Sequence, residues 1–257
     1  MDYNYHTHTY FCHHASETPE EYVIWAIKNG IKYMGFSEHF PLKFSDGTQS
    51  GYRLAVENIE DYANQINVLR EKYKDQIEIK LGFEMEYYKE LFDEMLNNAI
   101  KYGAEYLILG EHYICPENSG AEAATRETYD EEKLEAYTNC VVEAIETKKY
   151  TYVAHPDIIN FKGDREKLEE AYRQICIASR ETNIPLELNF LGIRGNRNYP
   201  NELFFKIAGE EKSPITFGFD AHSKAEAYDG KSLIKAKEWV LRYKLNYIGK
   251  PKLMPLE

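Results

Sequence analysis

The residues of this sequence that could do chemistry are its histidines. All eight have the same position relative to the short apolar segments of the chain. Each lies at the end of a short apolar or aromatic segment, or a few residues beyond it: His6, His8, His13, His14, His39, His112, His155 and His222. Imidazole nitrogens are favoured ligands of zinc and other first-row divalent metal ions. Histidines in equivalent places therefore predict a metal site.

Two carboxylates share these places. Glu84 ends the segment 77–84, and Asp220 directly follows the segment 214–219. Imidazoles and carboxylates without a compelling thiolate suit zinc, manganese or iron, and they outnumber the ligands that one tetrahedral ion needs. In His6-Thr7-His8, alternate residues of an extended strand point to the same side, so both rings can reach one ion. We therefore expect more than one divalent metal ion.

A single histidine at a strand end is more often an ordinary hydrogen-bonded residue than a ligand. The prediction depends on a coincidence: six separate strand ends supply His, Glu or Asp, while the long helical segments contain no histidine. Loop geometry decides whether His13 or His14 is the ligand, and we favour His14. Cys12 and Cys115 lie near the expected ligands, but we interpret both as packed thiols.

The elements that must position these residues alternate between short apolar segments and longer amphipathic ones, which predicts βαβ units and a parallel sheet. Seven strands are expected, at Tyr3–His6, Tyr33–Phe36, Ile77–Glu84, Tyr106–Leu109, Thr151–Ala154, Pro185–Asn189 and Pro214–Phe219. In a parallel barrel the carboxyl ends of the strands converge on one face, where such enzymes place their catalytic groups. A barrel would thus bring the histidines together.

Capping residues and apolar periodicity predict the helices between these strands. Thr18-Pro19-Glu20-Glu21 has the pattern of a capped helix start, and Asn29-Gly30 that of a helix end. Apolar residues at helical spacing predict a helix after Asp164 and others over about Leu54–Tyr73, Lys89–Tyr102, Glu131–Thr147 and Lys231–Tyr243. No Pro/Gly/Ser-rich linker divides the chain, so residues 1–257 are expected to form a single domain.

Composition limits the possible partners. The chain has 43 acidic against 31 basic side chains and a formal net charge of −12, which argues against a broad basic surface for nucleic acid or anionic lipid. It contains no run of 18 apolar residues, and its first residues lack the pattern of a signal peptide. Its four cysteines form no C-x-x-C pair and suggest no disulfide framework. We expect a soluble, cytoplasmic protein that binds neither nucleic acid nor membranes.

Taken in order, these motifs resemble those of the polymerase and histidinol phosphatase (PHP) family of metal-dependent phosphoesterases. The matching series is H-x-H, a loop His, E-H, Glu, H, H-P-D and D-A-H, and it extends from His6 to His222. The stretch Asn189–Arg194, followed by Tyr199-Pro200, is similar to the stand-alone histidinol-phosphate phosphatase branch. The resemblance implies an α/β fold, a distorted (β/α)7 barrel, with a three-metal centre at the carboxyl ends of its strands.

The resemblance also implies which residues hold each ion. The first ion would be held by His6, His8, Glu84 and Asp220; the second by Glu84, His112 and His155; and the third by His14, His39 and His222. Glu111 departs from the family pattern, since a small or hydroxyl residue is expected before His112. This departure concerns the substrate, because a carboxylate near the metals would repel phosphate or bind an ammonium group.

The reaction implied is hydrolysis of a phosphomonoester by a hydroxide that the metal ions activate. At least one of Arg194 and Arg197 is expected to bind the phosphate, because a guanidinium can bind phosphate oxygens through two hydrogen bonds. Asp157 and Asp220 are alternative proton donors to the leaving group.

The expected substrate is L-histidinol phosphate, an intermediate of histidine biosynthesis, whose ammonium and imidazole groups could pair with Glu38, Glu86 or Glu111. One alternative is a PHP phosphoesterase for another small phosphate ester or nucleotide. Another is a non-catalytic module that supports a polymerase.

Overall fold

Parallel strands form the centre of the computed structural model, which describes residues 1–257 and every side chain except that of residue 119. Four strands pair in the order β1 (Tyr3–Asn4), β2 (Tyr33–His39), β3 (Glu78–Met85) and β4 (Tyr106–Leu109). A second group pairs in the order β5 (Leu186–Asn189), β6 (Pro214–Gly218) and β7 (Asn246–Tyr247). All of these pairs are parallel.

Two junctions close the strands into a ring. Between β4 and β5, Val153 forms parallel bridges to Leu109 on one side and Leu186 on the other. On the opposite side of the ring, Thr7 bridges in parallel to Ala221, which joins the end of β1 to the end of β6. The ring thus runs through β1, β2, β3, β4, residues 151–154, β5 and β6. This is the predicted distorted seven-stranded α/β barrel.

The strands differ from the prediction at several points. β1 ends at Asn4 rather than His6, because the His6 backbone N–H donates to the Asn4 side chain (3.1 Å) instead of to a neighbouring strand. Residues 151–154 were expected to be a regular strand, but they form isolated bridges at Val153 and one further bond, from the Thr151 N–H to the Leu107 carbonyl at 2.7 Å. β7 was not predicted, and two residues are too few to leave a periodic pattern.

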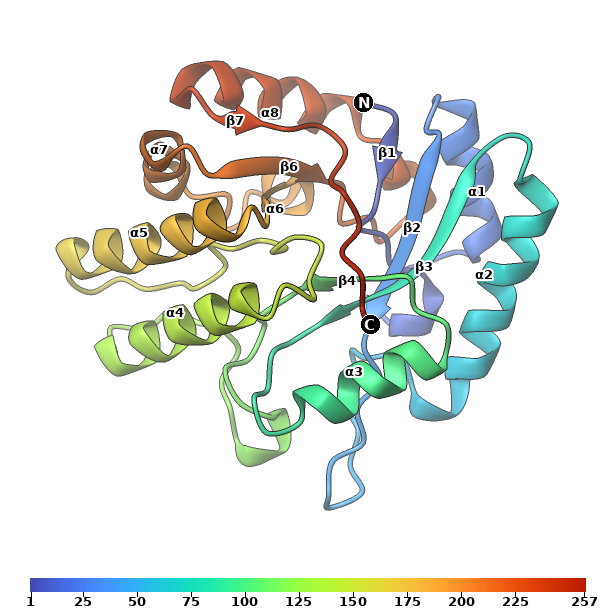
Figure 1. Ribbon diagram of the computed structural model, residues 1–257, viewed down its shortest axis with the longest axis horizontal. Coiled ribbons are helices and arrows are strands. Elements are labelled where there is room, and N and C mark those ends of the chain that lie inside the picture. The colour runs from blue at the N-terminus through green and yellow to red at the C-terminus, as the bar shows by residue number, and fades with distance from the viewer.

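Helices surround this ring (Figure 1). The α-helices are α1 (Pro19–Lys28), α2 (Ile59–Tyr73), α3 (Phe92–Lys101), α4 (Glu131–Glu146), α5 (Arg165–Thr182), α6 (Phe190–Gly195), α7 (Glu202–Glu211) and α8 (Gly230–Tyr243). Short 3₁₀ helices are η1 (Tyr10–Cys12), η2 (Val56–Asn58), η3 (Glu117–Ser119) and η4 (Lys224–Ala227). The predicted start of α1 is confirmed, since the Glu21 carboxylate accepts from the backbone N–H of Thr18 at 3.1 Å.

Other helix boundaries differ from those predicted. The helix predicted from Leu54 begins only at Ile59, because residues 56–58 form the 3₁₀ turn η2. The helices α6 and α7 were not predicted. α6 is short and contains two glycines, whereas α7 has a recognisable start at Asn201, whose side chain accepts from the Leu203 N–H.

The last residues of the chain cross the amino-terminal end of the barrel (Figure 1). Leu253 packs there against a cluster of buried aromatic residues that includes Tyr3, Tyr106 and Tyr152, and the Met254 N–H donates to the Thr151 hydroxyl. This end is therefore covered, and the carboxyl ends of the strands remain for a site. Within the part of the chain that the structure describes, no helix is both long and apolar enough to cross a membrane.

Candidate metal centre

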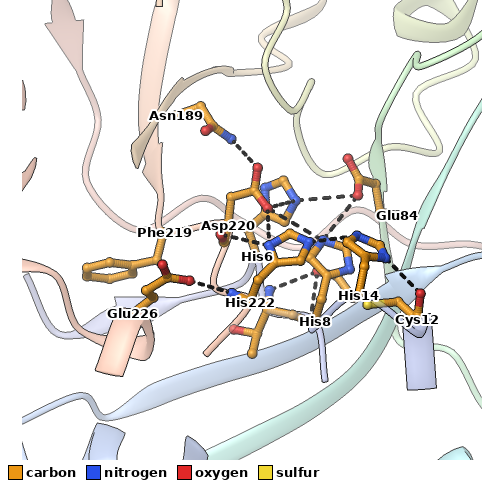
Figure 2. Close-up of polar contacts among 12 residues, drawn as sticks. His6, His8, Cys12, His14, Glu84, Asn189, Phe219, Asp220, His222 and Glu226 are labelled. Carbon is orange, nitrogen blue, oxygen red and sulfur yellow. Dashed lines mark hydrogen bonds and ion pairs between the residues drawn. The ribbon is translucent and has the colours of Figure 1, made fainter. Parts of the chain in front are cut away.

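The predicted ligands converge at the carboxyl ends of the strands. Figure 2 shows this for His6, His8, His14, Glu84, Asp220 and His222. They come from β2, β3 and the segments that follow β1, β4, residues 151–154 and β6. Groups of these residues place one ligand atom each within 4.8 Å of the others, which is the spacing that atoms around a shared ion require.

The set expected for the first ion lies deepest. His6, His8 and Glu84 are buried and form one group of ligand atoms. Nε2 of His6 is 3.5 Å from Oε2 of Glu84 and 3.6 Å from Oδ1 of Asp220. The Asp220 carboxylate is in turn held by the Asn189 side-chain amide at 3.0 Å, so it faces the imidazoles in a fixed orientation.

The set expected for the second ion shares Glu84. Nε2 of His155 lies 2.8 Å and Nε2 of His112 lies 3.6 Å from Oε1 of Glu84. The other carboxylate oxygen, Oε2, faces His6 and His8. The two oxygens of Glu84 thus face two different groups of imidazoles, which is the arrangement that a bridging ligand needs.

The set expected for the third ion lies nearest the surface. His14, His39 and His222 form one group, and the Nε2 atoms of His14 and His222 are 3.0 Å apart. His13 belongs to none of the groups found among the described residues, and its backbone takes a left-handed conformation with φ 63°. This arrangement favours His14 over His13 as the ligand.

The donor atoms of this site fit metal ions, because several of them are buried without a hydrogen bond. Nε2 of His6, Nε2 of His8 and Oε2 of Glu84 are all in this state, although they face one another. A buried polar atom without a partner costs about 1–3 kcal/mol. A divalent ion among these atoms would remove that cost.

The ionisation of the carboxylates also suits metal binding. Burial raises the pKa of Glu84, but the nearby imidazoles, His112 first and then His6, bring it well below its usual range. Burial likewise raises the pKa of Asp220, and His6 and His222 outweigh it and lower the value. Both groups are therefore ionised, the state in which a carboxylate coordinates metal.

The pKa values of two of the histidines are shifted in opposite directions. Burial and the neighbouring His8 lower the pKa of His222 to about 3, so His222 is neutral. Burial also lowers the pKa of His8, but the nearby carboxylates of Glu38 and Glu84 raise it to about 9 overall. His8 would hold a proton that a metal ion must displace, so metal affinity should depend on pH.

Three further buried carboxylates lie behind the ligands. Glu187 accepts from Nδ1 of His6 at 2.7 Å, and Glu86 accepts from Nδ1 of His112 at 2.9 Å. Glu38 lies 3.8 Å from Nδ1 of His8. Such partners fix the tautomer and direction of an imidazole ligand. Sequence reasoning missed Glu187, and its only signal was its place in a predicted strand.

This arrangement corrects the expectation that Glu38, Glu86 or Glu111 pairs with the substrate. Glu38 and Glu86 face imidazoles, and Glu38 also accepts from the backbone N–H of Thr9. Glu111 is buried away from the cavity, and burial raises its pKa well above the usual range. The departure from the family pattern at Glu111 therefore adds no carboxylate to the cavity lining.

The backbone is strained where it presents two of the ligands. His155 and Asp220 have φ values of 30° and 47°, which residues other than glycine rarely adopt. The His155 N–H is held by Glu187 at 2.9 Å. Gly218 makes room for that carboxylate, since a Cβ there would lie 1.6 Å from its Oε1 atom. Local strain is thus compensated by the residues that orient the ligands.

A cavity of about 420 Å³ opens onto the ligands. Its other lining residues are Tyr52, Tyr113, Ala123, Thr125, Ile158, Leu191, Arg197, Tyr199 and Glu226. Arg197 is exposed, and its guanidinium donates to the Tyr199 hydroxyl at 3.1 Å. The cavity therefore offers one arginine to an anion beside the ligands. A larger groove of about 940 Å³ between α3, α4 and the loop after β2 contains none of the predicted ligands.

The structure does not bring Arg194 or Asp157 to this cavity. Arg194 donates to the backbone carbonyls of Phe219 and Asp220 and contacts Glu226, so its guanidinium is already engaged. Asp157 is buried and accepts from the Asn201 backbone N–H, outside the cavity lining. The geometry thus favours Arg197 alone as the phosphate-binding arginine and argues against Asp157 as the proton donor.

A parallel α/β barrel with imidazoles and carboxylates around a cavity at its carboxyl end is a metal-binding barrel of the kind that enzymes use. The model of the PHP domain family matches residues 4–190. The chain therefore belongs to the PHP domain family, as the sequence motifs predicted.

Individual relatives cover most of the chain. A histidinol-phosphatase from Bacillus subtilis is 27% identical over 252 residues, which covers 86% of this chain and 93% of that protein. A histidinol-phosphatase from Lactococcus lactis is 25% identical, with 85% and 83% covered.

Solved structures share the fold. The histidinol phosphate phosphatase of L. lactis, complexed with zinc, L-histidinol and phosphate, matches with a TM-score of 0.72 at 21% identity, covering 99% of this chain and 97% of that one. A putative histidinol phosphatase from Listeria monocytogenes matches with a TM-score of 0.73 at 23% identity, with 90% and 99% covered.

Proposed function

We propose that this chain is a metal-dependent phosphatase that hydrolyses L-histidinol phosphate to L-histidinol and phosphate, a step of histidine biosynthesis. The observation that carries the proposal is the group of inward-facing imidazoles and carboxylates, with unpaired buried donor atoms, beside a cavity that contains Arg197. The names of the relatives and the contents of the L. lactis structure support this substrate.

The proposed centre holds three divalent ions, zinc, manganese or iron, in the ligand sets His6, His8, Glu84 and Asp220; Glu84, His112 and His155; and His14, His39 and His222. When bound, such ions neutralise phosphate oxygens and lower the pKa of water toward neutrality. The candidate ligands form several overlapping groups of donor atoms, more than one ion needs, which supports a centre with more than one ion.

The chain's own residues have distinct roles in this proposal. Arg197 binds the phosphate through charged hydrogen bonds and orients it toward the ligands. Asp220 lines the cavity, so it relays the proton of the attacking water to the leaving oxygen. Asn189 keeps the Asp220 carboxylate in place for this exchange. The aromatic side chains Tyr52 and Tyr113 form a wall that limits the access of water.

The remaining parts of the proposal concern the chain as a whole. Residues 1–257 form one domain, supported by a single large apolar core that includes residues from Phe11 to Leu256. The enzyme works in the cytoplasm on a small substrate, and it binds neither membranes nor nucleic acid. Its net charge of −12 supports the lack of binding to such anionic partners.

A substrate panel tests the function. Phosphate release by the metal-loaded protein would be measured with L-histidinol phosphate, sugar phosphates, nucleoside monophosphates and a small phosphodiester. We expect kcat/KM for L-histidinol phosphate to exceed the others by about 100-fold or more. Equal values across the panel would favour a general PHP phosphoesterase, and no turnover of any ester would favour a non-catalytic module.

A further inference from the structure

A fully buried arginine lies behind the metal centre, in the long segment between β2 and α2. Arg53 is 1% exposed. A guanidinium in such a place must be matched by acceptors, because an unpaired buried charge is very costly. Its acceptors therefore indicate what it is there to hold.

Those acceptors come from separate parts of the chain. Nη1 of Arg53 donates to the Glu86 carboxylate at 2.7 Å and to the Phe40 carbonyl at 3.1 Å. Its Nε donates to the Glu117 carboxylate at 2.8 Å. Arg53 thus fastens the ends of β2 and β3 and the loop after β4 to one another. These three segments carry His39, Glu84 and His112.

The contact with Glu86 leads directly to a predicted ligand. The second oxygen of Glu86 lies 2.9 Å from Nδ1 of His112. A carboxylate at that distance holds the proton on Nδ1, which leaves the lone pair of Nε2 free to point toward Glu84, 3.6 Å away. The direction of the His112 ring thus depends on the position of Glu86, and that position depends on Arg53.

The same cluster fixes a wall of the cavity. The Tyr52 hydroxyl lies 3.0 Å from Glu86 and 2.6 Å from Glu117, and the Arg53 guanidinium packs over the Tyr52 ring at 5.0 Å. The Tyr52 ring lies edge-on to that of His39, with 5.1 Å between centroids. Arg53 therefore touches neither a ligand atom nor the cavity, but it contacts the residues that orient both.

We propose that Arg53 is a positioning residue of the metal centre, acting through Glu86 on His112 and through Tyr52 on the cavity wall. The inference rests on the proposed metal centre. Replacing Arg53 should therefore weaken the binding of one ion selectively, the ion that His112 holds. Excess metal should then restore turnover.

Zinc affinity separates this role from a purely structural one. In Arg53→Met one of the bound zinc ions is expected to lose about 10–100-fold in affinity, whereas the others keep theirs. Turnover at saturating zinc recovers to within a few-fold of the wild type. Arg70→Met is the matched control, since Arg70 is a half-buried arginine that pairs with Glu105 and the Ile79 carbonyl outside the site. It should bind zinc as the wild type does.

A second variant keeps the test decisive if Arg53→Met does not fold. Glu86→Gln removes the charge between Arg53 and His112 and should weaken the same ion. In the double variant Arg53→Met/Glu86→Gln, the loss should be no greater than in Arg53→Met alone, since both substitutions break one chain of contacts. Wild-type zinc affinity in folded Arg53→Met or in Glu86→Gln, or additive losses in the double variant, would overturn the inference. A wild-type protein that binds no zinc would instead overturn the proposed centre.

Discussion

Replacing Glu187 with glutamine should weaken metal binding although Glu187 would touch no ion. The Glu187 carboxylate accepts three hydrogen bonds: from Nδ1 of His6 at 2.7 Å, from the His155 N–H at 2.9 Å and from the Asn189 side-chain amide at 2.7 Å. All three partners face it as donors. A glutamine has nearly the same shape, but one of its two ends is itself a donor.

Either orientation of the new amide creates a conflict. With its NH₂ group toward His6, the imidazole must move its proton to Nε2, the atom that faces Glu84 and Asp220, and His6 stops being a ligand. With its NH₂ group toward His155 and Asn189, donors face donors. Asn189 could then turn, but it would lose its bond to Asp220.

The size of the loss in metal affinity follows from these two orientations of the amide. One buried donor left without a partner costs about 1–3 kcal/mol. This range corresponds to a loss in metal affinity of about 10–100-fold, the size usually found when the hydrogen-bond partner of a ligand is changed. We expect Glu187→Gln to fold, to bind zinc with that loss and to have lower turnover at limiting zinc.

Competition with a chromophoric chelator would measure the affinity. The matched control is Glu105→Gln, because Glu105 accepts from Arg70 and Lys80 outside the metal site and undergoes the same chemical change. Zinc affinity of Glu187→Gln within about twofold of the wild type would refute the reasoning, since half a kcal/mol is below the cost of one unpaired buried donor.

Three other predictions follow from the site. Arg197→Ala should lower kcat/KM about 10²–10³-fold. Arg194→Ala should leave KM unchanged and lower Tm by about 4–8 °C, because charged hydrogen bonds are lost. Steady-state kinetics and calorimetry distinguish the two variants, and the reverse pattern would restore Arg194 as the phosphate ligand. Asp157→Ala removes the acceptor of the Asn201 N–H and loosens the turn that carries Arg197, so KM should rise about tenfold for all esters. A loss of kcat that grows with the pKa of the leaving group would instead make Asp157 the proton donor. Chelation should abolish turnover and lower Tm by about 8–16 °C, as expected for loss of a ligand present at about 1,000 times its Kd; an unchanged Tm in a scanning calorimeter would count against ions that stabilise the fold.

The sequence was sufficient for the ring of strands and for where the site lies, because both leave local patterns. Apolar segments mark buried parallel strands, and an imidazole directly after such a segment, as in His112 or His155, falls at the carboxyl end of the barrel. Alternation explains why His6 and His8 point the same way. The capped start of α1 was equally local.

What the sequence could not supply are contacts between distant segments. Nothing around Arg53 or Glu187 indicates that they lie behind His112 and His6, since these pairs are joined only when the barrel closes. Arg194 shows the reverse error, because its spacing from Arg197 suggested a shared role. The fold turns Arg194 back onto the carbonyls after β6 instead. The direction of a loop side chain is decided by tertiary packing, which no local pattern records.

The central claim is that bound divalent ions and the imidazoles that face them perform phosphate ester hydrolysis. Metal-free protein titrated with zinc, while phosphate release from L-histidinol phosphate is followed, tests this directly. We predict no release without metal and a rise in rate that stops near three equivalents of zinc per chain. Undiminished release from the metal-free protein, or no release at any zinc concentration that the protein binds, would contradict it.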